Sequence, residues 1–126
     1  MSITTLLAVG IAGFFGAITR YLTAYQISLW LGDTFPYATL FINASGSLVL
    51  GFSARYLSEH LLVSDMIRIG WTVGFLGAFT TFSTFSYESV LLMQEGEFLK
   101  AGMNIVMNGA VCLRLWFVGL QLTKIL

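Results

Sequence analysis

The sequence has few charged residues for its length. Six basic and six acidic side chains occur in 126 residues, so 10% of the chain is charged, whereas a soluble domain carries about 25%. Hydrophobic residues make up 57% of the chain. This composition excludes a disordered segment, which needs high polarity or net charge. A small water-soluble globule exposes too much surface to be covered by so few charges. We therefore expect a membrane protein surrounded mostly by lipid.

Other scarcities exclude classes of function. The net charge is zero and no basic patch is present, which argues against nucleic-acid binding. Cys112 is the only cysteine, so neither an intrachain disulfide nor a thiolate metal cluster can form. His60 is the only histidine, which leaves zinc short of ligands. There is no nucleotide-binding motif, and the polar loop around His60 is best interpreted as a solvated connection. We expect no enzyme and no nucleotide partner.

Long uncharged runs predict the fold class. The chain is uncharged from Thr34 to Ala54 and from Ile69 to Tyr87, and about 20 apolar residues are needed for a helix to cross a bilayer. The short connections between the runs make consecutive helices antiparallel. We expect an all-α protein with one domain, residues 1–126, and four transmembrane helices at roughly Ile3–Trp30, Tyr37–Glu59, Met66–Gln94 and Phe98–Lys124.

The charges give only a slight preference for one orientation in the membrane. With an even number of spans, both termini lie on the side of the second connection, which carries Arg55, Arg68 and Lys124, while the other side carries Lys100. This is a faint positive-inside bias. Two interpretations stay open: an ordinary chain with its termini inside, or a chain that inserts both ways and pairs with an inverted copy of itself.

Two stripes of polar side chains lie within the apolar runs. Members of each stripe are four residues apart, so they share one face of a helix. Such stripes indicate a hydrated or ion-conducting track, or interhelical hydrogen bonds that hold helices together. We favour the track. The stripes are Thr39, Asn43 and Ser47 in the second expected helix, and Asn104, Asn108 and Cys112 in the fourth.

A bundle of four helices is too small to enclose a solute path, because its own side chains fill the core. A homodimer or larger assembly is therefore expected. Small residues four apart, such as Ser47 and Gly51, are typical of close helix contacts. Arg20 interrupts the first span and needs a partner or a cavity. It can attract anions into a vestibule or pair with Glu88, and the sequence leaves both open.

The densest pattern runs from Gly74 to Glu88. Closely spaced glycines are followed by hydroxyl residues that alternate with phenylalanines, which makes a poor continuous helix. A helix broken in mid-membrane exposes carbonyls that can line a cavity or bind an ion such as Na⁺. The edges of the Phe82 and Phe85 rings are electropositive. Together with the Asn43 amide, they would favour a small anion.

Here the chain resembles the Fluc, or CrcB, fluoride channels over essentially its full length. The third-helix motif is highly specific, whereas the first-helix motif alone would be weak. The matching residues are Gly16-Ala17-Ile18-Thr19-Arg20-Tyr21, Asn43 with Gly46, Gly77, and Thr80-Thr81-Phe82-Ser83-Thr84-Phe85-Ser86 with the trailing Glu88.

The resemblance implies an antiparallel, dual-topology homodimer with two fluoride pores and one structural Na⁺ at the centre of its interface. It also implies that the third helix is broken and that backbone carbonyls of Gly77 and Thr80 hold the Na⁺. Phe82 and Phe85 would contact F⁻ through their ring edges, and Asn43 would donate its amide to F⁻. The implied polar neighbours along the pore are Thr39, Ser83 and Thr84.

The fourth helix departs from the family pattern. The family's polar track there uses Tyr and Ser, whereas this chain has Asn104, Asn108 and Cys112. Asparagine can still donate a hydrogen bond to fluoride, while a thiol is a weak donor. We expect an altered track with a weaker second contact at Cys112.

The expected function is a passive fluoride-selective channel of the inner membrane, which exports F⁻ and lowers cytoplasmic fluoride toxicity. One alternative is a small proton-coupled multidrug exporter, which would need a buried carboxylate in its first helix. No acidic residue precedes Asp33, which argues against it. Another alternative is a non-transporting assembly subunit, in which the polar stripes only join helices.

Overall fold

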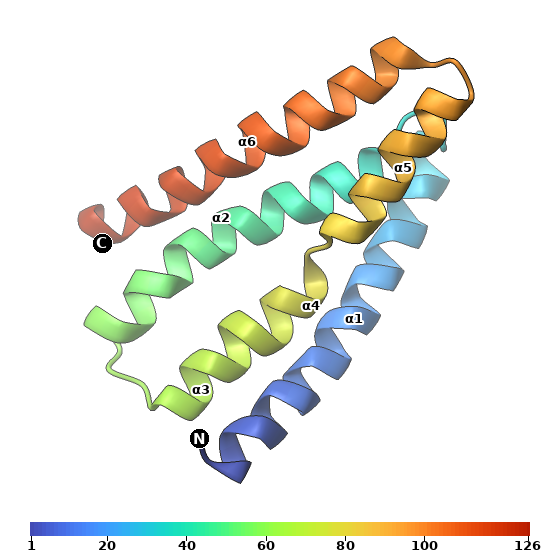
Figure 1. Ribbon diagram of the computed structural model, residues 1–126. Helices are drawn as coiled ribbons and strands as arrows, with labels where there is room; N and C mark the ends of the chain where they lie inside the picture. Colours follow the sequence, from blue (N-terminus) through green and yellow to red (C-terminus); the bar gives the residue numbers. More distant parts are fainter.

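The computed structural model describes the whole chain, Met1–Leu126, as helices without strands (Figure 1). Three helices are long, and each lies within one residue of its expected bounds. The third expected helix is divided into shorter pieces. The long helices are α1 (Ile3–Leu31), α2 (Tyr37–Glu59) and α6 (Phe98–Ile125), and the pieces are α3 (Asp65–Ile69), the π-helical η1 (Gly70–Leu76), α4 (Gly77–Phe79) and α5 (Phe82–Gln94).

Local chemistry explains where the helices begin and end. The Ser2 side chain accepts a hydrogen bond from the Thr5 N–H at the start of α1, which satisfies a donor that has no partner within the helix. After α1, Gly32 has φ 74°, and Gly96 between α5 and α6 has φ 78°. These positive φ angles suit glycine, which lacks the Cβ that strains other residues there. The ends of α1 and α5 therefore lie where the sequence permits a sharp turn.

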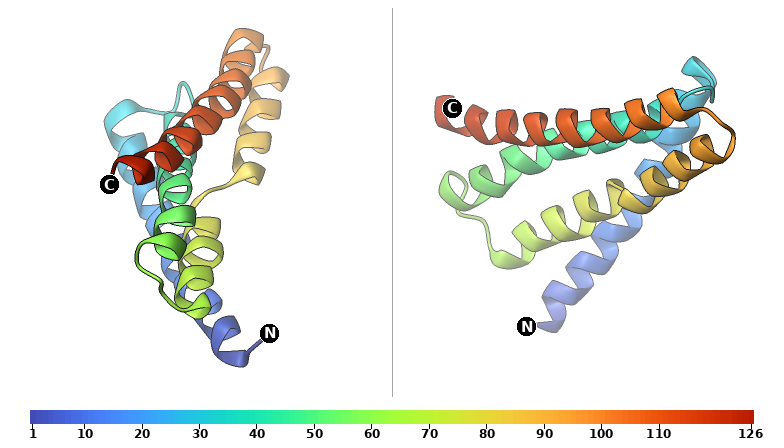
Figure 2. Two further views of the ribbon diagram at one scale, coloured as in Figure 1. Left: turned by 90° about the vertical axis from the view of Figure 1, so that its left-hand side faces the viewer. Right: turned by 45° about the horizontal axis from the view of Figure 1, so that its top comes forward.

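The main packing contacts join helices that run in the same direction. Over much of their length α2 and α6 lie side by side, and α1 packs against η1 and α4 (Figures 1 and 2). Gly51 explains the first pair, because a Cβ there would overlap the carbonyl oxygen of Trp116 in α6. The expected antiparallel order of consecutive helices is present, but the closest contacts are between alternate helices.

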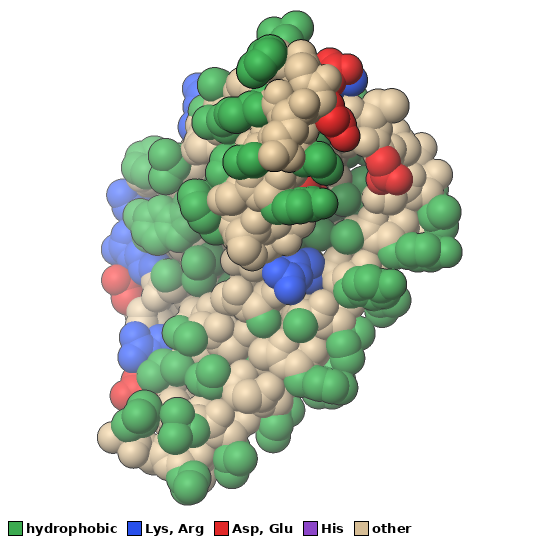
Figure 3. Space-filling view, turned by 45° about the vertical axis from the view of Figure 1, so that its right-hand side comes forward, with side chains coloured by type: hydrophobic (Ala, Val, Ile, Leu, Met, Phe, Trp, Pro, Cys, Tyr) green, Lys and Arg blue, Asp and Glu red, His purple; other side chains and the backbone are tan.

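The exterior of the chain is apolar. Only 19 of the 126 residues are buried, and hydrophobic side chains are distributed over the visible face from one end of the molecule to the other (Figure 3). Large exposed apolar surfaces are typical of contact with lipid or another protein. α1, α2 and α6 are each long and apolar enough to cross a membrane. These features agree with the expected all-α membrane protein.

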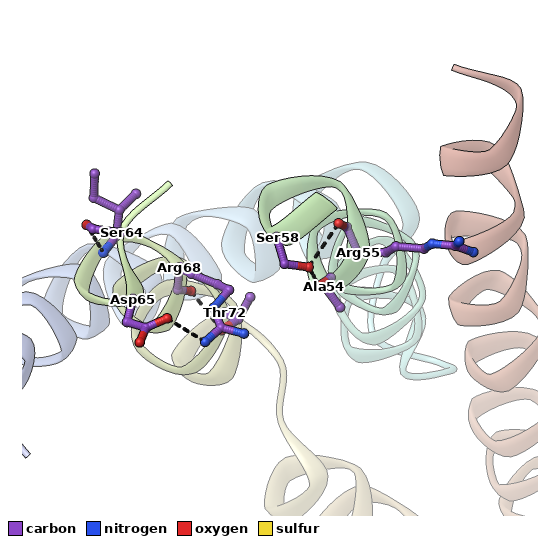
Figure 4. A network of polar contacts seen from close by, with 8 residues as sticks. Ala54, Arg55, Ser58, Ser64, Asp65, Arg68 and Thr72 are labelled. Atoms are coloured by element: carbon purple, nitrogen blue, oxygen red, sulfur yellow. Dashed lines mark hydrogen bonds and ion pairs between the residues drawn. The ribbon is translucent and has the colours of Figure 1, made fainter. Parts of the chain in front are cut away.

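Both chain termini and the α2–α3 connection lie at one end of the molecule, the arrangement that the four expected crossings would give (Figure 1). At this end Arg68 contacts Asp65 at 2.7 Å, and Ser58 donates to carbonyls of its own helix (Figure 4). Arg55 pairs with Glu59, also at 2.7 Å. All the ion pairs are local and solvent-accessible, so each contributes at most about 1 kcal/mol. Charge therefore contributes little to the folding of the bundle.

Candidate functional site

The candidate site is built around the interruption between α4 and α5 (Figure 1). Thr80 and Thr81 are extended there, with ψ 158° and 119°. The Thr81 hydroxyl then accepts a hydrogen bond from the Thr84 N–H at 3.2 Å, which caps the start of α5. A β-branched pair whose second member supplies the capping hydroxyl favours this extended geometry over a continued helix.

Asn43 of α2 binds the interruption through two hydrogen bonds to one residue. Its Nδ2 donates to the Thr81 carbonyl at 2.9 Å, and its Oδ1 accepts from the Thr81 N–H at 2.8 Å. The neighbouring turn of α2 carries Gly46, where a Cβ would overlap the Cγ2 of Thr80. A primary amide and a small residue one turn apart therefore hold the extended segment against α2.

The interruption leaves two backbone carbonyls without their helical donors. In a continuous helix the Thr81 N–H would donate to the Gly77 carbonyl, but it donates to Asn43. The Thr84 N–H would donate to the Thr80 carbonyl, but it donates to the Thr81 hydroxyl. Carbonyls freed in this way are the ligands with which broken membrane helices bind Na⁺. The chemistry of Gly77 and Thr80 thus fits a hard cation.

A chain of side-chain amides continues from Asn43 into α6 and α5. Asn43 Nδ2 donates to Asn108 Oδ1 at 3.1 Å. Asn108 Nδ2 donates to Asn104 Oδ1 at 2.9 Å and to the Asn104 carbonyl at 3.0 Å. Asn104 Nδ2 then donates to the Ser89 hydroxyl at 3.0 Å. We call Asn43, Asn108, Asn104 and Ser89 the amide relay. It joins residues from three helices.

A cavity of about 520 Å³ lies beside the relay. Two aromatic rings border it: the centroids of Phe82 and Phe85 are 5.3 Å apart, and the rings are tilted by 58°. The walls come from α2, the interruption, α5 and α6. The cavity is lined by Asn43, Ser47, Leu50, Thr80, Thr81, Phe82, Phe85, Ile105, Asn108, Gly109 and Cys112.

The cavity brings together most of the residues expected along the polar track. Asn43 and Ser47 of the α2 stripe face Asn108 and Cys112 of the α6 stripe across one space. Asn104 is on the same stripe but is 0% exposed and does not line the cavity.

Three other expected pore residues lie elsewhere. Thr39 is buried and donates to Glu88 Oε1 at 2.7 Å. Ser83 and Thr84 are on the exposed first turn of α5, outside the cavity lining.

Arg20 is partly exposed on α1 and takes part in none of the three ion pairs of the chain. Glu88 receives the Thr39 hydroxyl, while its other oxygen, Oε2, is buried without a partner. The pairing of Arg20 with Glu88, which the sequence left open, is not formed within one chain.

Sequence reasoning missed two residues with clear structural roles. The backbone of Thr81 binds the Asn43 amide, and its hydroxyl caps the start of α5. Threonine is a common residue at the N-cap of a helix, but without Glu or Gln three residues later the signal at Thr81 is weak. Ser89 ends the amide relay, and no spacing within its own helix indicates this role.

Most of the chain matches one family of known proteins. Residues 7–120 match the family described as "CrcB-like protein, Camphor Resistance (CrcB)". A protein of Photobacterium profundum named "Fluoride-specific ion channel FluC" is 46% identical over 123 residues, 97% of each chain. Proteins with the same name from Geobacter sulfurreducens and Aliivibrio salmonicida are 42% and 43% identical. They align over 87% and 92% of this chain, and over 89% and 92% of their own lengths.

Proposed function

Because this chain belongs to the CrcB-like family, we propose that it is a fluoride-selective channel and that F⁻ crosses the membrane passively through the cavity beside the amide relay. It is a multi-pass membrane protein and, like the relatives that carry the channel name, not an enzyme. The inner membrane is the location consistent with this family. Net export follows from the membrane potential, which drives an anion outwards by about 2.3 kcal/mol per 100 mV.

The observation that carries this proposal is the composition of the cavity wall. It combines the amides of Asn43 and Asn108 with the rings of Phe82 and Phe85, and contains no charged side chain. Amide N–H groups donate to an anion, and an aromatic ring offers its positive edge. Conduction also requires that the ion can leave its site, and neutral donors of this kind bind an anion without a fixed opposite charge. The wall therefore suits a small, strongly hydrogen-bonding anion in transit.

A single chain does not enclose this path, and we propose an antiparallel, dual-topology homodimer that completes it. The exposed apolar side chains of α1, among them Phe14, Phe15 and Leu22, offer surface for a second copy. The interruption at Thr80 and Thr81 would lie in mid-membrane, since it follows a helical stretch from Asp65 and precedes α5. The second copy would supply a second pore.

The carbonyls of Gly77 and Thr80 are proposed to hold a structural Na⁺ at the dimer interface. Their helical donors are engaged by side chains, and carbonyl oxygen is a ligand suited to a hard cation. The ion would supply positive charge that joins the two copies. Arg20 is proposed as a vestibule or interface charge, since no acidic partner in its own chain contacts it.

Fluoride efflux from proteoliposomes tests the function. Purified protein is reconstituted at low density, and F⁻ release is followed with a fluoride electrode beside a Cl⁻ control. We expect rapid F⁻ release and none for Cl⁻. No F⁻ flux from a well-folded protein would contradict the channel and would favour the non-transporting subunit. A multidrug exporter is not supported, because α1 contains no carboxylate.

A further inference from the structure

The amide relay has a fixed direction. The oxygen and nitrogen of an Asn side chain are distinguished by the hydrogen bonds that they make. Asn43 contacts both the N–H and the carbonyl of Thr81, so only one orientation of its amide satisfies both. That orientation turns Nδ2 towards Asn108, which must then present its oxygen. Asn108 consequently turns its own Nδ2 towards Asn104.

The relay uses every amide N–H that the two cavity-lining asparagines possess. A primary amide has two N–H donors. Those of Asn43 go to the Thr81 carbonyl and to Asn108 Oδ1. Those of Asn108 go to the carbonyl and the side chain of Asn104. In this conformation neither residue has a free N–H for an anion in the cavity.

Asn108 is the relay residue that accepts from Asn43, and its side chain is bonded only to Asn43 and Asn104. Asn43 is held by two bonds to the backbone of Thr81, and Asn104 is 0% exposed. Asn108 is 8% exposed and borders the cavity. Its Oδ1 lies 3.1 Å from the Asn43 nitrogen, which is hydrogen-bonding distance, and therefore occupies the donor that an anion would need.

We propose that Asn108 is a gating residue whose side-chain oxygen competes with F⁻ for the Asn43 amide. This inference rests on the proposed fluoride function. When Asn108 turns away, the Asn43 N–H becomes available to the cavity while Thr81 still fixes its position. Fluoride binding and the Asn43–Asn108 hydrogen bond are mutually exclusive. The barrier to conduction then includes breaking the relay at this bond.

The test compares F⁻ efflux at subsaturating fluoride for the wild type, Asn108→Ala and Asn108→Asp. Loss of one competing hydrogen bond changes an equilibrium by about 2- to 10-fold, so we expect the half-saturating fluoride concentration of Asn108→Ala to fall by about that factor. Asn108→Asp keeps an acceptor on Asn43 and adds negative charge, so its flux should fall at least about 10-fold. Met107→Ala, on the same helix but outside the cavity lining, is the matched truncation control.

A second measurement does not depend on conduction. The ¹H–¹⁵N signals of the Asn43 side chain are followed during titration with NaF and, separately, with NaCl. We expect a saturable shift with NaF only, at lower fluoride in Asn108→Ala and in the milder Asn108→Ser. Size-exclusion chromatography checks that each variant is folded.

The outcomes separate the two proposals. A wild-type protein that releases no F⁻ contradicts the proposed function. A wild-type protein that conducts, together with an Asn108→Ala variant whose half-saturating fluoride is unchanged or higher, contradicts the gating role of Asn108 alone. An Asn43 signal that does not respond to NaF also contradicts it.

Discussion

At the scale of single residues, the asparagine amides of this chain serve both structure and transport. Asn43 replaces the hydrogen bond that a continuous helix would give Thr81, and it also borders the cavity. A buried peptide group without a partner costs about 1–3 kcal/mol. Substitution of Asn43 would therefore disturb folding and conduction together. The phenylalanines are the better single-residue test, because their rings make no hydrogen bond that the fold requires.

Replacement of Phe82 by isoleucine tests the aromatic part of the pore. Phe82 is 78% exposed in the single chain, so the smaller side chain should leave the fold intact. The positive ring edge is lost, and we expect F⁻ efflux to fall at least about 10-fold. Efflux is measured with the fluoride electrode, and dimer formation by size-exclusion chromatography. Unchanged efflux would exclude Phe82 from the path.

At the scale of helical elements, the fold depends on two local arrangements: the cap of α5 and the close contact of α2 with α6. Neither involves charge. The α5 cap restarts a helix directly after the extended residues. The α2–α6 contact brings the two polar stripes face to face at the cavity. Loss of either would change the site without touching a pore-lining ring.

Replacement of Thr81 by alanine removes the α5 cap. Loss of an N-cap hydroxyl costs about 0.5–2 kcal/mol, so the midpoint of thermal denaturation should fall. Thr81→Ser is the matched control, because it keeps the hydroxyl that accepts from Thr84. Equal midpoints for the alanine and serine variants would show that this hydrogen bond does not stabilise α5.

Replacement of Gly51 by alanine tests the contact between α2 and α6. The added Cβ would overlap the Trp116 carbonyl, and overpacking of this kind costs about 1–3 kcal/mol. Gly102→Ala is the control, because a Cβ there has no neighbour within 4 Å in the chain. We expect a lower denaturation midpoint for Gly51→Ala alone. A midpoint equal to that of the wild type would contradict the importance of this close approach.

At the scale of the whole molecule, the proposed antiparallel dimer is supported by the lack of a strong charge difference between the two ends of the chain's helices. Its net charge is zero, and six of its twelve charged residues form three local pairs at helix ends. A strong excess of Lys and Arg on one side would fix the orientation. A faint bias fixes the orientation only weakly, which is compatible with the two orientations that the proposed antiparallel dimer requires.

Orientation can be measured with a Leu126→Cys variant in a Cys112→Ser background, so that only the C-terminal thiol reacts. If the chain inserts both ways, a membrane-impermeant maleimide added to intact cells should label about half of the molecules. Permeabilised cells, in which all molecules should react, provide the control. Labelling of nearly all or nearly none of the molecules in intact cells would contradict dual topology.

A second variant carries three lysines inserted after Tyr56. If charge bias sets the orientation, this variant should have a different labelled fraction.

Much of the architecture followed from the sequence alone. Hydrophobic length and charge placement determined the three long helices to within one residue, since the thickness of a bilayer sets the length of a spanning helix. The specific motif around Phe82 also indicates the family whose model matches residues 7–120. The long helices and the motif around Phe82 depend on local composition, because each is formed by one continuous stretch of the chain.

The connections within the site were decided by the tertiary structure. Spacing placed Asn43 and Asn108 each on a helix face, but not on facing surfaces, because helix periodicity does not say which helices become neighbours. The close approach at Gly51 makes α2 and α6 adjacent. That contact lets Asn43, which also binds Thr81, donate to Asn108, so the amide relay joins residues that no single helix contains.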